Sequence, residues 1–210
     1  VEAIAEAGLV GIALGNTPAA MAPWGGRTPV FGTNPLAFAA PRHPHPLVVD
    51  LSLSKVARGR IMVAAKRGDV IPEGWALDAQ GAPTTDPDAA LAGSMVPLGD
   101  AKGAALALMV EILTAGLTGS HLAFEASSFF TAEGDPPCVA QLFLLLDPDR
   151  FAGAGVFAER LETLAAAILG QPGTRLPGER RLLHRQQADR VGVVVPAALL
   201  RDLEQRSGSV

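Results

Sequence analysis

Short runs of apolar residues bounded by glycine, proline or an acid punctuate the chain, and this pattern is typical of buried strands. The runs are three to six residues long, too short for helices that bury a continuous stripe. They predict strands at residues 9–14, 36–40, 47–49, 141–146 and 191–195.

Other segments carry helical patterns with recognisable start and stop signals. The first residues predict the last two turns of a helix ended by Gly8. A helix is expected to start after Ser52 or Ser54 as N-cap, and another near the TTDP run at 84–87. The predicted helices are 1–8, 55–66, one from 84–87, 104–117, 151–169, 179–190 and 196–205.

Strands mixed with helices indicate an α/β, more strictly a mixed α+β, fold. The alternation is too irregular for a doubly wound sheet. Residues 18–35 are rich in proline and glycine but contain Met21, Trp24 and Phe31. We therefore expect this segment to be a loop packed onto the body of the protein.

Composition excludes several classes of protein. Of 210 residues, 49% are hydrophobic and 18% are charged, which is the opposite of the composition of a disordered chain. The net charge of −4 gives no electrostatic support for nucleic-acid binding. The longest apolar stretch, residues 104–117, is interrupted by Glu111 and is too short for a membrane span. With the single Cys138 and no basic leader, we expect a cytoplasmic protein without disulfides.

The chain opens with Val1 in the middle of a helical pattern. We therefore expect the sequence to be truncated at its N-terminus. The glycine fingerprint of a Rossmann fold, the phosphate loop of nucleotide hydrolases and the serine elbow of hydrolases all fail to match. The histidines lack the spacing and neighbours of a metal site, so no metal is expected.

Two features have the chemistry to hold a ligand. Asp50, Leu51 and Ser52 end an apolar run where a helix is expected to start, a place where an acid can accept ribose hydroxyls; an ordinary turn with an N-cap explains them equally well. Lys102 and Gly103 precede the apolar helix 104–117, where a lysine is favoured if an anion lies between it and the helix. A solvated lysine is the alternative.

An ordered set of motifs runs along the chain: GNTP (15–18), APWGG (22–26), GTNPLAF (32–38), VDLSLSKVARG (49–59), IPEGWALD (71–78), PTTDP (83–87) and Lys102-Gly103. Together they resemble the malate/L-lactate dehydrogenase family, which also contains ureidoglycolate, sulfolactate and diketogulonate dehydrogenases and an imine-reducing branch. The resemblance covers essentially the whole chain and is densest over 9–118.

The resemblance implies a homodimeric, cytoplasmic oxidoreductase that uses NAD or NADP on a small 2-hydroxy or 2-keto acid. Its fold would be the non-Rossmann sulfolactate/malate dehydrogenase fold, incomplete at the N-terminus. Residues 1–120 would form the core of the cofactor-binding domain, and 121–210 would complete the sheet and the wall of the dimer and active site. Thr33 would lie near the substrate. The implied cofactor contacts are Thr17, Asp50, Leu51, Ser52, Arg58, Lys102, Gly103, Gly178, Glu179 and Arg180.

The chain departs from the family pattern in features that bear on catalysis and on the choice of substrate. The family's catalytic histidine and a substrate-binding arginine belong upstream of Val1, so no catalytic residue is assigned and little turnover is expected from this chain alone. Gln141 stands where many members carry histidine, and Arg60 stands where imine-reducing members tend to be acidic, which favours hydroxy-acid chemistry. An inactive nucleotide-binding or dimer-forming remnant and an imine reductase remain the alternatives.

Overall fold

A computed structural model describes residues 1–131 and 133–208 of the chain. The chain divides into two compact units, Val1–Leu164 and Ala165–Val210. Among the helices of the described residues, none is both long and apolar enough to cross a membrane.

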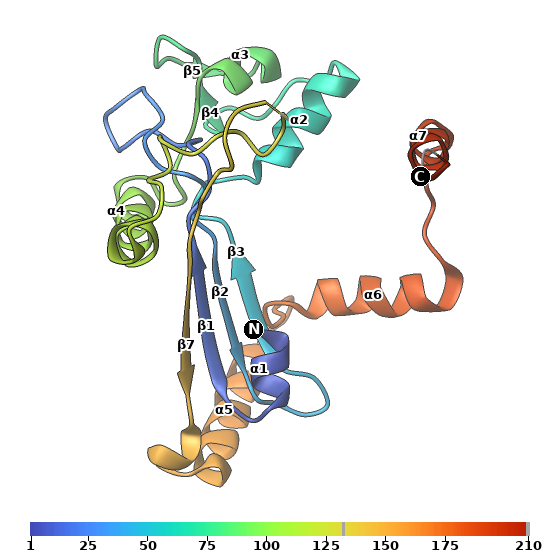
Figure 1. The fold of residues 1–210 in the computed structure, drawn as a ribbon. Coiled ribbons are helices and arrows are strands. Elements are labelled where there is room, and N and C mark those ends of the chain that lie inside the picture. Colours follow the sequence, from blue (N-terminus) through green and yellow to red (C-terminus); the bar gives the residue numbers. More distant parts are fainter. Residues whose placement is uncertain (132, 209–210) are drawn as a thin grey trace. The chain divides into compact units, whose positions relative to one another are not determined.

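A four-stranded antiparallel sheet organises the first unit (Figure 1). Its register places Leu14 opposite Leu36, Leu36 opposite Leu51, and Gly15 opposite Gln141. The ends of two strands and the starts of two others therefore meet at one edge, called here the ligand edge, which is the upper end in Figure 1. The spatial order is β3 (Leu47–Leu51), β2 (Leu36–Ala40), β1 (Val10–Gly15) and β7 (Gln141–Leu146).

Helix α1 (Glu2–Glu6) covers part of this sheet and explains the glycine inside β1. A Cβ on Gly11 would lie 2.9 Å from Cγ2 of Ile4, so only glycine lets the helix approach the strand this closely. Gly8 follows the helix with φ of 84°, the left-handed conformation predicted for its stop. Ala5, Ala39 and Val48 form the small core between them.

The main core lies beyond the ligand edge, where Figure 1 shows short strands and helices. The 18–35 segment enters this core as predicted, since Met21 is fully buried and bridges both Phe31 and Met95, while Trp24 remains exposed. The surrounding elements are α2 (Arg58–Arg67), β4 (Ala76–Leu77), β5 (Pro83–Thr84), α3 (Pro87–Ala92), β6 (Ser94–Met95) and α4 (Ala101–Glu111).

Helix α2 begins at Arg58, three residues later than predicted, and neither Ser52 nor Ser54 caps it. The preceding residues are held in an extended segment: Leu53 N–H donates to the Thr33 carbonyl and Lys55 N–H donates to the Val96 carbonyl, each at 2.8 Å. These long-range bonds compete with helix formation and delay its start.

Helix α4 begins earlier than predicted, so Lys102 and Gly103 lie in its first turn and not before it. After Glu111 the helix widens into a π-helical turn, η1 (Ile112–Gly116). Only one face of this apolar helix is buried: Ala104, Ala107 and Val110 are covered, whereas the side chains of Leu106, Leu108, Met109 and Ile112 are exposed in this chain.

Helix α5 (Ala154–Leu169) begins three residues later than predicted and crosses the boundary between the two units. A short 3₁₀ turn, η2 (Pro148–Arg150), precedes it, capped by the Asp147 carboxylate, which accepts from Asp149 N–H at 3.0 Å. Within the first unit, Glu162 of α5 forms a two-pronged ion pair with Arg42.

The second unit contains α6 (Glu179–Val191) and α7 (Ala197–Ser207), close to the predicted helices. The strand predicted at 191–195 is wrong. Val191 belongs to α6, Gly192 ends that helix with φ of 79°, and the following valines have no regular structure, with Val194 fully exposed. A valine run forms a strand only when another strand supplies hydrogen-bond partners, and no described strand lies in this unit.

Candidate functional site

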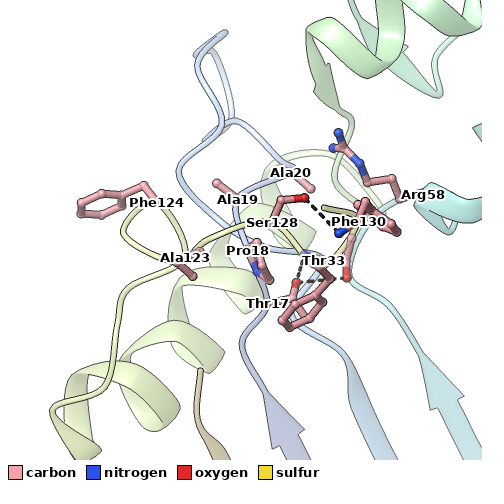
Figure 2. Close-up of a pocket in the computed structure, with 12 residues that line it drawn as sticks. Thr17, Pro18, Ala19, Ala20, Thr33, Arg58, Ala123, Phe124, Ser128 and Phe130 are labelled. Carbon is pink, nitrogen blue, oxygen red and sulfur yellow. Dashed lines mark hydrogen bonds between the residues drawn. The ribbon is translucent and has the colours of Figure 1, made fainter. Parts of the chain in front are cut away.

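A pocket of about 330 Å³ lies past the ligand edge of the sheet (Figure 2). Its size is at the lower end of the range typical of small-molecule sites, about 300–1,000 Å³. Three of the residues expected at the site from the sequence line it, namely Thr17, Thr33 and Arg58. The remaining lining residues are Pro18, Ala19, Ala20, Ala123, Phe124, Ala126, Ser128, Phe129 and Phe130.

Thr17 and Thr33 form the polar part of the pocket and lie side by side in Figure 2. The Thr33 N–H donates to Oγ1 of Thr17 at 3.0 Å, and the two hydroxyls are 3.4 Å apart. Gly32 makes this approach possible, because a Cβ there would overlap both the carbonyl and the hydroxyl oxygen of Thr17. The two segments are thus packed backbone against backbone.

Arg58 supplies the positive charge of the pocket. Its guanidinium carbon lies 5.9 Å from the centre of the Phe130 ring, and Nη2 donates to the Leu91 carbonyl at a long 3.4 Å. None of the ion pairs formed by the described residues includes Arg58, and burial lowers the pKa of its guanidinium. A half-buried arginine without a carboxylate partner is well suited to bind an anionic group such as a carboxylate or a phosphate.

The aromatic wall comes from the segment between η1 and β7, which the sequence reasoning did not assign to the site. Phe129 and Phe130 are about half exposed, and Phe130 N–H donates to the Ser128 hydroxyl at 3.1 Å. The adjacent phenylalanines were the available signal, since neighbouring large apolar residues in an irregular segment seldom both find a place in the core.

The segment Asp50–Leu51–Ser52 lies at the same edge of the sheet but does not line the pocket. Asp50 is exposed at the end of β3, and the Ser52 hydroxyl lies 3.1 Å from the hydroxyl of Ser54. Its place at the carboxyl end of a strand is the one anticipated for a ligand contact. The helix expected directly after it starts six residues beyond Ser52.

Lys102 and Gly103 have different environments although they are neighbours. The Lys102 side chain is exposed in the first turn of α4, whereas Gly103 is buried. A Cβ on Gly103 would overlap the carbonyl oxygen of Leu98. The close approach that the glycine permits is therefore already used by the chain itself, which explains this glycine without a ligand.

Gly178, Glu179 and Arg180 belong to the second unit. Gly178 is the N-cap of α6, with φ of 85°, a left-handed conformation that favours glycine, and the other two residues form the first turn. The three residues therefore lie at the start of a helix, and their contact with a cofactor stays a prediction.

Two further residues singled out from the sequence lie outside the pocket. The guanidinium carbon of Arg60 lies 4.9 Å from the centre of the Trp75 ring, and both residues line a different hollow. Gln141 is exposed at the start of β7, opposite Gly15. Among residues 1–131 and 133–208, no group of three or more histidine, cysteine or acidic side chains is arranged to hold a metal ion.

Comparison with known proteins gives a consistent result. The family model described as malate/L-lactate dehydrogenase matches residues 1–204. The chain is 58% identical over 205 residues to a (2R)-3-sulfolactate dehydrogenase (NADP(+)) from Chromohalobacter salexigens, and 48% identical over 206 residues to a Delta(1)-pyrroline-2-carboxylate reductase from Pseudomonas fluorescens. These alignments cover 97% of this chain but only 60% and 61% of the relatives.

A solved structure shows the same arrangement. The sulfolactate dehydrogenase from Methanocaldococcus jannaschii superposes with a TM-score of 0.87 at 31% identity, over 97% of this chain and 60% of that one. The mixed α/β fold of the sulfolactate/malate dehydrogenase type, expected from the sequence motifs, is confirmed.

Proposed function

The chain belongs to the malate/L-lactate dehydrogenase family, as its ordered motifs predict, and we propose that it forms the nicotinamide-binding part of an oxidoreductase. The substrate would be a small carboxylic acid that reacts at the carbon next to its carboxylate. The observation that carries this proposal is the pocket past the ligand edge, in which Thr17, Thr33 and Arg58 converge from three separate segments.

The residues of the pocket suit such a substrate. Arg58 offers a fork of N–H donors for a carboxylate, the two threonine hydroxyls can donate to or accept from a second polar group, and the phenylalanines exclude water from one side. Exclusion of water strengthens every electrostatic contact within the pocket. The chain's own residues therefore bind and orient, and no proton-transferring group is assigned among them.

Arg58 and the threonine hydroxyls also suit a nicotinamide dinucleotide, whose phosphates are anionic and whose hydroxyl and amide groups need hydrogen-bond partners. When bound, the nicotinamide would supply or accept hydride. In the first unit, the residues proposed to contact it are Thr17, Asp50, Leu51, Ser52, Arg58, Lys102 and Gly103. In the second unit, considered by itself, the candidate cofactor residues are Gly178, Glu179 and Arg180. The name of the sulfolactate dehydrogenase relative supports NADP as the form used.

Two substrate classes have support, and the imine-reducing one is favoured. Several relatives at 41–48% identity are named Delta(1)-pyrroline-2-carboxylate reductases. The apolar wall of Phe129, Phe130 and Pro18 offers a surface to such a ring. The relative with 58% identity instead supports a 2-hydroxy acid. Arg60, which favoured hydroxy acids in the sequence, lies on Trp75 outside the pocket and so has no direct contact with its contents.

The test follows NADPH in two preparations, the 210-residue chain and the natural gene product that contains it. Δ1-pyrroline-2-carboxylate, pyruvate with and without methylamine, oxaloacetate, and 3-sulfolactate with NADP⁺ form the panel. We expect little turnover from the 210-residue chain, and turnover of one substrate class by the natural gene product. Rates from the 210-residue chain equal to those of a complete dehydrogenase would contradict this assignment of roles.

Cofactor binding is tested separately by NADPH fluorescence. Lys102→Ala should weaken binding. Lys66→Ala, which changes an exposed lysine in the last turn of α2, is the matched control. If neither the chain nor the natural product alters NADPH fluorescence, the alternative of a non-catalytic, dimer-forming remnant replaces this proposal. The same samples test the proposed homodimer by light scattering.

A further inference from the structure

Glu111 is a buried acid at the junction between α4 and the π-helical turn η1, only 5% exposed. Its Oε1 accepts from Ala123 N–H at 2.7 Å and from Nδ2 of Asn16 at 3.3 Å, and its Oε2 accepts from Nδ2 of Asn34 at 2.8 Å. Across the part of the chain that the structure describes, no ion pair includes this carboxyl group.

The three donors come from three different segments that build the pocket. Asn16 precedes Thr17, Asn34 follows Thr33, and Ala123 is itself a lining residue. Each donor is therefore no more than one residue from a pocket wall. Because adjacent Cα atoms are about 3.8 Å apart, a shift of any donor moves the neighbouring lining residue with it.

The three donors around residue 111 require a side chain that accepts hydrogen bonds at both of its terminal atoms. Three N–H donors face the carboxyl group, and an ionised carboxylate accepts at both oxygens, whereas an amide must turn an NH₂ group toward one of them. Asn34 cannot compensate by rotating its amide, since Nδ2 also donates to the Ala107 carbonyl at 2.9 Å. Asn16 is fixed as well, because its Oδ1 accepts from Ala140 N–H at 2.7 Å.

We propose that Glu111 is a positioning residue: its carboxylate holds the three segments that carry Thr17, Thr33 and Ala123 in the geometry of the ligand pocket. The inference that this geometry serves cofactor or substrate binding rests on the proposed function. The π-helical turn that follows Glu111 is consistent with such a role, because π-turns inside α-helices are frequent at functional sites.

The test compares Glu111→Gln with Thr114→Val. Thr114 is fully buried three residues after Glu111, and its hydroxyl donates only to the Val110 carbonyl at 2.7 Å. Loss of this hydroxyl should therefore perturb the helix locally and leave the pocket unchanged. Amide chemical shifts of Thr17, Thr33 and Ala123 are recorded for both variants, together with NADPH affinity at a temperature where both remain folded.

Glu111→Gln should move the amide signals of all three lining residues and weaken NADPH binding about 10-fold or more, because each loss of about 1.4 kcal/mol from a less preorganised pocket lowers affinity tenfold. Thr114→Val should leave both readouts near those of the parent chain. Equal effects of the two variants, or unchanged lining signals in Glu111→Gln, would overturn the proposal.

A second measurement needs no variant, which matters if Glu111→Gln does not fold. The Ala123 N–H points into a buried carboxylate, so it should exchange with solvent slowly although it lies in an irregular segment. Rapid exchange of this amide in the parent chain would refute the proposal. If the parent chain fails to bind NADPH while these structural signals behave as expected, the proposed function fails and the positioning role stands.

Discussion

Gly32→Ala offers a sharp test of how the pocket is assembled. A Cβ at this position would overlap the carbonyl and hydroxyl oxygens of Thr17 and lie 2.7 Å from Oδ1 of Asn34. The Thr17 carbonyl belongs to the backbone just beyond β1, and Asn34 is fully buried, so neither can yield by a simple rotation. The substitution must therefore push the 32–34 segment away from the end of β1.

The cost follows from overpacking. Forcing an additional methyl into a close-packed site costs about 1–3 kcal/mol, and rigid backbone neighbours favour the upper part, about 2–3 kcal/mol. For a unit of this size each kcal/mol lowers Tm by about 2–4 °C, so the expected fall is about 4–12 °C. The hydrogen bond from Thr33 N–H to Thr17 is at risk as well, which should weaken NADPH binding in parallel.

Tryptophan fluorescence during thermal unfolding is a suitable assay, because Trp24 and Trp75 are the two tryptophans of the chain and both belong to the first unit. Gly59→Ala is the control: it lies early in α2 with no atom within 4 Å of the added Cβ, and alanine should raise helix stability by up to about 1 kcal/mol. A Gly32→Ala chain with unchanged Tm and unchanged NADPH affinity would show that the packing argument is mistaken.

Two further substitutions test single contacts. Arg58→Ala removes the cation of the pocket and should weaken NADPH or substrate binding about 10- to 100-fold, the equivalent of about 1.5–3 kcal/mol for a charged hydrogen bond. Arg60→Ala, which loses only the stacking on Trp75, should leave binding unchanged. Equal losses of affinity in titrations of the two variants would show that Arg58 is not part of the site. The Asp86 carboxylate caps α3 by accepting from Asp88 N–H at 2.9 Å. Asp86→Ala removes this cap and should lower the free energy of unfolding by about 1 kcal/mol in urea titrations, whereas Asp86→Asn should leave it nearly unchanged.

The sheet was predictable because its strands are short apolar runs with clear boundaries. The ranges 9–14, 36–40, 47–49 and 141–146 each differ from the observed strands by no more than two residues. Residues 191–195 show the same local pattern of apolar residues but form no strand. Unlike the four observed strands, this segment has no described strand in its unit to pair with. Strand formation depends on a second chain segment, which a local pattern cannot reveal.

The helix starts were less predictable for a related reason. Ser52 and Ser54 have the side chains of N-caps, but the bonds of Leu53 and Lys55 to Thr33 and Val96 hold this segment extended. Lys102 and Gly103 showed the reverse error, since α4 extends past the position where its apolar run begins. At the start of α2, contacts distant in sequence decide the boundary, whereas the backbone hydrogen bonds at the start of α4, such as that from Ala104 N–H to the Asp100 carbonyl, are local.

The site was predictable only in part, because its residues come from segments that the sheet brings together. Thr17, Thr33 and Arg58 were identified through family motifs, and their meeting in one pocket is visible only in three dimensions. The pocket's aromatic wall and Glu111 were not predicted to belong to the site. Glu111 did leave a signal: a single acid between Val110 and Ile112 interrupts the longest apolar run, and a charge in such a place must find buried partners.

A pocket built from loops needs a different source of rigidity from one built on strands. The segments around Thr17, Thr33 and Ala123 lie outside the sheet's hydrogen-bond ladder, so side chains must satisfy and fix their backbone. Asn16, Asn34 and Glu111 do this from within the core, and each is at least nine-tenths buried. Because these bonds need no ligand, the pocket should be preorganised, which lowers the entropic cost of binding and makes the buried carboxylate as important to the site as the residues that line it.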